Sequence, residues 1–98
     1  MTTLNAEQRR YLRAQAHPLH PVVMIGDAGL SDAVLREIDL NLKAHELIKI
    51  RVHGDDRDAR VAMQDRICNE LNAATVQHIG KLLIVYRAAD KAKINLPK

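Results

Sequence analysis

Aromatic side chains are scarce in this chain of 98 residues, which has no Trp, no Phe and two Tyr. Proteins that hold single-stranded nucleic acid by stacking present several aromatic side chains to successive bases. Tyr11 and Tyr86 alone cannot form such a platform. The composition therefore excludes recognition by aromatic stacking.

Cysteine and long apolar runs are also scarce. Cys68 is the single cysteine, which excludes an internal disulfide or a cysteine zinc site and fits a reducing compartment. We expect it to be a small buried hydrophobic residue. Residues 1–20 are polar, and no apolar run approaches the roughly 18 residues that a membrane span needs. These absences predict a soluble, cytoplasmic protein with no membrane partner.

No set of side chains has the spacing of a catalytic or metal site. A chain of this length forms one domain, residues 1–98, with room for a single core but not for an elaborate catalytic cleft. The residues of ligand type in its turns are His17, His20, His53, Asp55 and Asp56. Their spacing matches no closed zinc site, and Ser31 is explained as a helix cap. We expect no enzyme, no cofactor, no metal and no small-molecule substrate.

Positive charge gathers at the two ends of the sequence. Lys and Arg number 15 against 12 Asp and Glu, a net charge of +3, but residues 1–20 carry +2, residues 81–98 carry +4 and the middle carries −3. If the ends meet in space, they form one basic surface. We expect residues 88–98 to be a basic tail.

Local signals divide the chain into alternating helices and strands. Asn5, with Gln8 three positions later, predicts a capping box and a first helix of about ten residues. Pro18 and Pro21 end it, and a strand at 22–25 follows. Ser31 caps a second helix over residues 32–44, whose apolar residues have helical spacing.

The second half of the chain continues the pattern. Residues 47–52 alternate strictly, which places Ile48, Ile50 and Val52 on one sheet face and Lys49 and Arg51 on the other, a face we expect to be solvated or partner-bound. After a turn at 53–56, a third helix ends near residue 72. Residues 75–79 and 82–86 form a hairpin.

The resulting order, α-β-α-β-α-β-β, predicts an α/β (α+β) fold. Two strand-helix-strand units favour parallel pairing, and the final hairpin adds an antiparallel strand. We expect a four-stranded mixed sheet with helices packed mainly on one face.

The clearest functional motif joins the first strand to the second helix. Gly26-Asp27-Ala28-Gly29 can expose several backbone N–H groups at a helix start, where the helix dipole favours anions. The loop lacks the third glycine of a dinucleotide site and the lysine of a P-loop. A polymeric phosphate backbone remains, so RNA is the leading partner.

Five separated segments resemble the YhbY-type proteins, the stand-alone bacterial form of the chloroplast RNA splicing and ribosome maturation (CRM) domain. The segments are His17-Pro18-Leu19-x-Pro21-Val22-Val23, Ile25-Gly26-x-x-Gly29-Leu30, His45-Glu46-Leu47-Ile48-Lys49, Gln77-x-Ile79-Gly80-Lys81 and Leu83-Ile84-Val85-Tyr86-Arg87, and Lys93-Ile94-Asn95-Leu96-Pro97-Lys98 looks like the family's end. The resemblance implies a fold similar to the C-terminal domain of translation initiation factor three. It also implies RNA binding through the glycine loop, and association with precursors of the large ribosomal subunit.

The candidate RNA-binding residues come from two sources. The resemblance implies the loop, Gly26, Asp27, Ala28 and Gly29, although Asp27 stands where family loops usually carry a small polar or basic residue. Alternation and charge add four basic residues, which are Lys49, Arg51, Lys81 and Arg87.

The sequence supports three hypotheses about function. The first is a monomeric, non-enzymatic protein that binds ribosomal RNA or pre-large-subunit particles during ribosome assembly. The second is a protein-interaction module that docks a ribosomal or assembly protein, with incidental RNA contact. The third is a general nucleic-acid compactor, which would bind duplex DNA as well as RNA.

Overall fold

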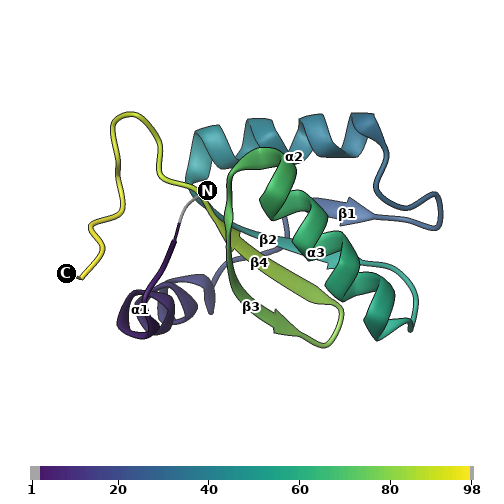
Figure 1. The fold of residues 1–98 in the computed structure, drawn as a ribbon, viewed down its shortest axis with the longest axis horizontal. Coiled ribbons are helices and arrows are strands. Elements are labelled where there is room, and N and C mark those ends of the chain that lie inside the picture. The colour runs from purple at the N-terminus through teal and green to yellow at the C-terminus, as the bar shows by residue number, and fades with distance from the viewer. Residues whose placement is uncertain (1–2, 98) are drawn as a thin grey trace.

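The alternating signals of the sequence correspond to three helices and four strands within residues 3–97, the part of the chain that the computed structural model describes (Figure 1). In chain order they are α1 (Ala6–Ala16), β1 (Val23–Ile25), α2 (Asp32–His45), β2 (Leu47–Val52), α3 (Arg57–Leu71), β3 (Ala74–Ile79) and β4 (Leu82–Tyr86). The predicted α+β class and element order are confirmed. Lys98, the last residue of the predicted tail, lies outside the described residues.

The strands form one mixed sheet in the order β1-β2-β4-β3. β1 pairs in parallel with β2, while β4 pairs antiparallel with both β2 and β3. Parallel pairing is thus correct for the first strand-helix-strand unit. It is wrong for the second, because β4 lies between β2 and β3 and the hairpin folds back into the middle of the sheet.

Two apolar clusters lie on opposite faces of this sheet. The larger cluster joins the sheet to α2 and α3 and includes Ile48, Ile50 and Val52 of β2. The smaller one joins the other face to α1 and includes Leu12 of the helix and Leu47 of the sheet. Two helices therefore cover one face, as predicted, and α1 covers part of the other.

The helix starts follow the predicted caps. Gln8 N donates to Asn5 Oδ1 (2.7 Å) while Asn5 N donates to Gln8 Oε1 (3.0 Å), which completes the capping box of α1. Val34 N donates to Ser31 Oγ (3.2 Å) at the start of α2. Cys68 is buried on α3, as expected, and burial raises the pKa of its thiol.

The segment after β4 passes the end of α2, and its last described residues lie beside α1 (Figure 1). Ile94 and Leu96 lie against the smaller apolar cluster. Gln8 Nε2 on α1 donates to the Pro97 carbonyl oxygen (3.0 Å). The two basic ends of the sequence therefore meet in space.

A buried carboxylate anchors this C-terminal segment. Glu46 is 1% exposed, and its carboxylate accepts hydrogen bonds from the backbone N–H groups of Ala89 (2.9 Å), Lys93 (2.6 Å) and Ile94 (3.1 Å). Burial raises the pKa of Glu46, but these donors and the charge of Lys93 outweigh it, and the pKa lies below its usual value.

Candidate nucleic-acid interface

The glycine loop lies between the end of β1 and the start of α2. Gly29 N donates to the Gly26 carbonyl oxygen (3.0 Å), which closes a tight turn. Gly29 has φ +77°, a conformation that residues with a Cβ rarely adopt. Within residues 3–97 the backbone N–H groups of Asp27, Ala28 and Leu30 have no acceptor. These donors lie beside the positive end of the α2 dipole, so the loop is suited to hold an anion.

Two further turns lie at the same end of the sheet. His53 N, after β2, donates to the carbonyl oxygen of Ile25 at the end of β1 (2.8 Å). Val52 N donates to the carbonyl oxygen of Lys81 in the β3–β4 turn (2.8 Å). The glycine loop, the β2–α3 turn and the hairpin turn therefore lie together, toward the right of Figure 1.

Charges of both signs occupy this end. Asp27 Oδ1 lies 3.4 Å from His53 Nε2, and Lys81 Nζ lies 3.1 Å from Asp55 Oδ1. All four side chains are exposed, and pairs of this kind contribute about 0 to 1 kcal/mol. Lys81 can therefore exchange Asp55 for a phosphate at little cost.

A buried cation lies behind the same turns. Arg60 is 8% exposed, and its guanidinium donates to His78 Nε2 (3.1 Å) and to the Gly54 carbonyl oxygen (3.4 Å). Neither partner is acidic, and no carboxylate among the described residues pairs with Arg60. Its positive charge is therefore not neutralised by direct contact with a carboxylate.

A row of four side chains crosses the uncovered part of the sheet beside the loop. Met24 of β1 pairs with Arg51 of β2, Arg51 pairs with Leu82 of β4, and Leu82 pairs with Ile79 of β3. Met24 is 70% exposed and Ile79 50% exposed. Arg51 is exposed and has no acceptor within the described part of the chain. The row is an apolar surface with one available guanidinium at its centre.

The structure separates the four predicted basic residues into two pairs. Arg51 and Lys81 lie at the loop end of the sheet, as the alternation and the turn indicated. Lys49 is 8% exposed, because α1 and the segment after it cover this part of β2, and its Nζ donates to the carbonyl oxygens of Leu19 (2.9 Å) and His17 (3.5 Å). The expectation that Lys49 lies on an open sheet face is wrong.

Arg87 has an internal role at the opposite end of β4. Its Nη1 donates to Asp39 Oδ1 (2.8 Å) and to the Leu71 carbonyl oxygen (2.8 Å), and its Nη2 donates to the Asp39 carbonyl oxygen (3.1 Å). The hydrogen bond from Arg87 lowers the pKa of the Asp39 carboxyl group. Arg87 therefore joins β4 to α2 and α3, away from the glycine loop.

Sequence reasoning missed Met24, Ile79 and Leu82 as surface residues. Their side chains lie on the same face of the sheet as Arg51. Nothing in the sequence of a short strand, however, indicates that an apolar side chain is exposed. Within residues 3–97 no group of three His, Cys, Asp or Glu side chains is placed to hold a metal ion. No described helix is long and apolar enough to cross a membrane.

The fold and this surface define a small α+β domain with a glycine loop at a helix N-terminus. Residues 4–87 match the model of the CRS1 / YhbY (CRM) domain. The chain belongs to this family, which confirms the resemblance seen in the sequence.

Relatives match over almost the whole chain. A Haemophilus influenzae protein named "RNA-binding protein" is 47% identical over 98 residues, covering 100% of this chain and 99% of the relative. A Pseudomonas aeruginosa protein named "Probable RNA-binding protein" is 38% identical over 93 residues, covering 95% and 89%. The solution structure of a hypothetical Staphylococcus aureus protein, titled "a putative RNA binding protein", matches with a TM-score of 0.85 and 31% identity, and the match covers 97% of this chain and 100% of that one.

Proposed function

We propose that this protein is a non-enzymatic RNA-binding protein whose glycine loop, Gly26–Gly29, holds the phosphate backbone. The observation that carries the proposal is the set of N–H groups without acceptors at Asp27, Ala28 and Leu30, next to the start of α2. Arg51, near the end of β2, and Lys81, in the β3–β4 turn, supply two cations at the same end of the sheet. The names of the relatives support RNA as the polymer.

The proposed partner is ribosomal RNA in precursors of the large ribosomal subunit. The family resemblance supports this choice. The surface fits structured RNA, because it offers backbone donors, two cations and an apolar row but no aromatic platform. Binding of this kind releases counterions, so the affinity falls steeply as salt rises.

The test compares two arginines on opposite sides of the molecule. Arg51→Ala removes a cation from the proposed interface, and Arg36→Ala removes an exposed cation from α2 as a matched control. With a structured ribosomal RNA fragment, we expect Arg51→Ala to weaken binding about 3- to 10-fold and to reduce the salt slope by about 1. Arg36→Ala should bind as the unaltered protein does. Equal effects of the two substitutions would remove Arg51 from the interface.

The exposed apolar row also suits a protein partner, which keeps the interaction-module hypothesis as the second candidate. Met24 and Ile79 are the observation in its favour. Ribonuclease treatment of the native complex separates the two functions, because it releases an RNA-bound protein and leaves a protein-bound one in place.

A further inference from the structure

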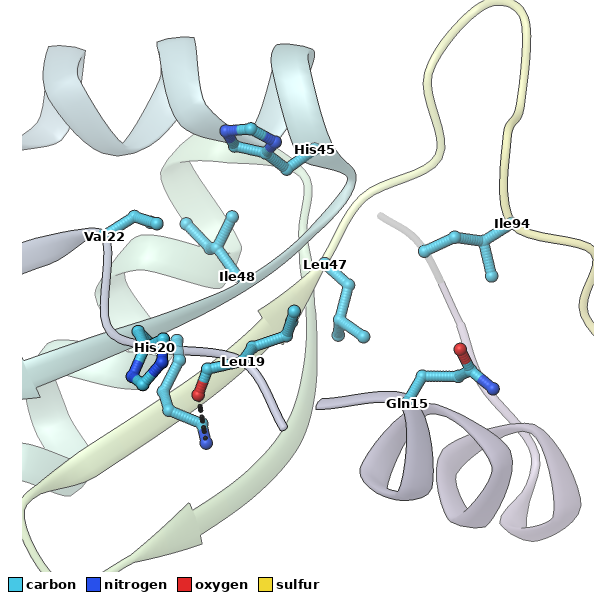
Figure 2. A pocket seen from close by; sticks show the side chains of 9 residues that line it. Gln15, Leu19, His20, Val22, His45, Leu47, Ile48 and Ile94 are labelled. Carbon is cyan, nitrogen blue, oxygen red and sulfur yellow. Dashed lines mark hydrogen bonds between the residues drawn. The ribbon is translucent and has the colours of Figure 1, made fainter. Parts of the chain in front are cut away.

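A pocket of about 390 Å³ opens at the edge of the sheet, between the end of α1, the end of α2 and the first half of β2 (Figure 2). The end of α1, the connecting segment after it, the end of α2, the first half of β2 and the C-terminal segment all contribute to its lining. Leu19 and Val22, both in the connecting segment, form apolar walls on one side of the pocket, and Ile94 forms one on the opposite side (Figure 2). The volume falls in the range of small-molecule sites, about 300 to 1,000 Å³.

The polar groups of the pocket define what it can hold. Gln15, His20 and His45 line it together with Lys49, and none of the lining residues from the described part of the chain carries a carboxylate. A carboxamide and two imidazoles offer both donors and acceptors. Such a set suits a flat, electron-rich ring held between aliphatic walls, and the absence of acidic lining disfavours a cation.

The pocket is continuous with the proposed RNA interface along the edge of the sheet. Val22 N, at the pocket, donates to the Lys49 carbonyl oxygen (3.0 Å), and the next pair in register on this face is Met24 with Arg51. Gly26 follows two residues later. At about 3.3 Å per residue, the pocket wall at Val22 lies about 13 Å from the glycine loop. An RNA strand whose phosphate is held at the loop can therefore place a neighbouring nucleotide at the pocket.

We propose that this pocket receives one unpaired nucleobase of the bound RNA. The proposal rests on the proposed function, because the glycine loop and Arg51 bring the strand to the pocket. The aliphatic walls contact the faces of the base, as aromatic side chains do in other RNA-binding domains. The Glu46 carboxylate supports one wall, since it holds the backbone N–H of Ile94.

The test fills the pocket with a large side chain. Val22 is 41% exposed and Val61, on the outer side of α3, is 40% exposed. Val22→Trp and Val61→Trp are therefore matched variants, one in the pocket and one remote from it. The probes are two fluorescein-labelled RNA duplexes, one fully paired and one that differs only by a single inserted, bulged nucleotide, and both are titrated at one salt concentration.

We expect the unaltered protein and Val61→Trp to bind the bulged duplex about fivefold or more tightly than the paired one. Val22→Trp should lose this preference and keep its affinity for the paired duplex within about twofold. Equal binding of both RNAs by the unaltered protein, or a preference retained by Val22→Trp, would overturn the pocket proposal alone. Failure to bind either RNA would overturn the proposed function as well.

A second variant keeps the test decisive if Val22→Trp does not fold. His20→Ala combined with His45→Ala removes both imidazoles from the pocket without adding volume, and both residues are exposed. The double variant should reduce the bulge preference while circular dichroism reports an unchanged fold. An unchanged preference in the folded double variant contradicts the proposal.

Discussion

Asp27 Oδ1, at the tip of the glycine loop, lies 3.4 Å from Nε2 of His53 in the next turn, and the two side chains are 89% and 68% exposed. The pair places a carboxylate where the proposed function places a phosphate. Because both groups are exposed, solvent and salt screen the repulsion between Asp27 and the RNA. The repulsion should amount to about 1 kcal/mol, or about a fivefold change in affinity.

Asp27→Asn is therefore expected to tighten RNA binding by about two- to fivefold at low salt, with a smaller gain at high salt. Fluorescence anisotropy with a labelled ribosomal RNA fragment measures the change. Asp32→Asn, also exposed at the start of α2 but outside the loop tip, is the comparison for a general effect of charge. Weaker binding by Asp27→Asn would instead show that the carboxylate accepts a hydrogen bond from the RNA.

The two glycines of the loop should respond differently to alanine. Gly29 has φ +77°, so Gly29→Ala forces a strained backbone and should lower the free energy of unfolding by about 1 kcal/mol. Gly26 has no such conformation, and a Cβ there meets nothing within 4 Å. Gly26→Ala should therefore leave stability within about 0.5 kcal/mol.

Urea denaturation of both variants gives the comparison, and RNA titration at a temperature where both are folded adds the functional reading. We expect Gly29→Ala to bind RNA less tightly than Gly26→Ala, because it alone distorts the turn that presents the N–H groups. Identical stability and affinity of the two variants would contradict the role given to the Gly29 conformation.

The Glu46 anchor predicts a pH-dependent stability. The folded-state pKa of Glu46 lies below its usual value of 4.5, so its ionised form stabilises the native state fully above that value. This stabilisation is lost as the pH falls through the folded-state pKa. Glu46→Gln removes the charge and should cost about 2 kcal/mol at pH 7.

Thermal or urea unfolding of both proteins between pH 7 and pH 3 tests this prediction. The difference in unfolding free energy should stay constant above pH 5 and shrink below it. A difference that is independent of pH down to pH 3 would show that the Glu46 charge does not hold the C-terminal segment.

Arg87 should matter for stability and not for RNA contact. Its guanidinium donates to Asp39 and to the Leu71 carbonyl oxygen, so Arg87→Ala leaves partly buried acceptors without donors and should cost about 2 kcal/mol. RNA affinity measured on the folded fraction should be unchanged. Arg51→Ala should show the opposite pattern to Arg87→Ala, because it should weaken RNA binding and leave the free energy of unfolding unchanged.

The helices and strands were predictable because their signals are local. Asn5 and Gln8 specify the start of α1 within four residues, and the alternation of residues 47–52 specifies both faces of β2. The burial of Lys49 was not predictable, because the residues that cover it, from α1 to Leu19, lie about 30 positions away in sequence. Local alternation indicates which side chains lie on the same face of the sheet, but not which distant segment packs on that face.

Strand order and the C-terminal segment depend on distant contacts in the same way. The position of β4 between β2 and β3 follows from its pairing with both strands. The charges of residues 88–98 predict a basic tail, but in the structure the Glu46 carboxylate binds the backbone N–H groups of Ala89, Lys93 and Ile94. For the candidate site, the sequence indicated the glycine loop, Arg51 and Lys81. That Met24 and Ile79 lie exposed beside Arg51 became apparent only from the strand register.

The most direct test of the central claim is to titrate ribosomal RNA into the ¹⁵N-labelled protein and follow each backbone amide by NMR. If the glycine loop holds the RNA backbone, the largest shifts fall on residues 26–32, with further shifts at Arg51 and Lys81. Shifts confined to the outer faces of α2 and α3, around Leu40 and Val61, would contradict it.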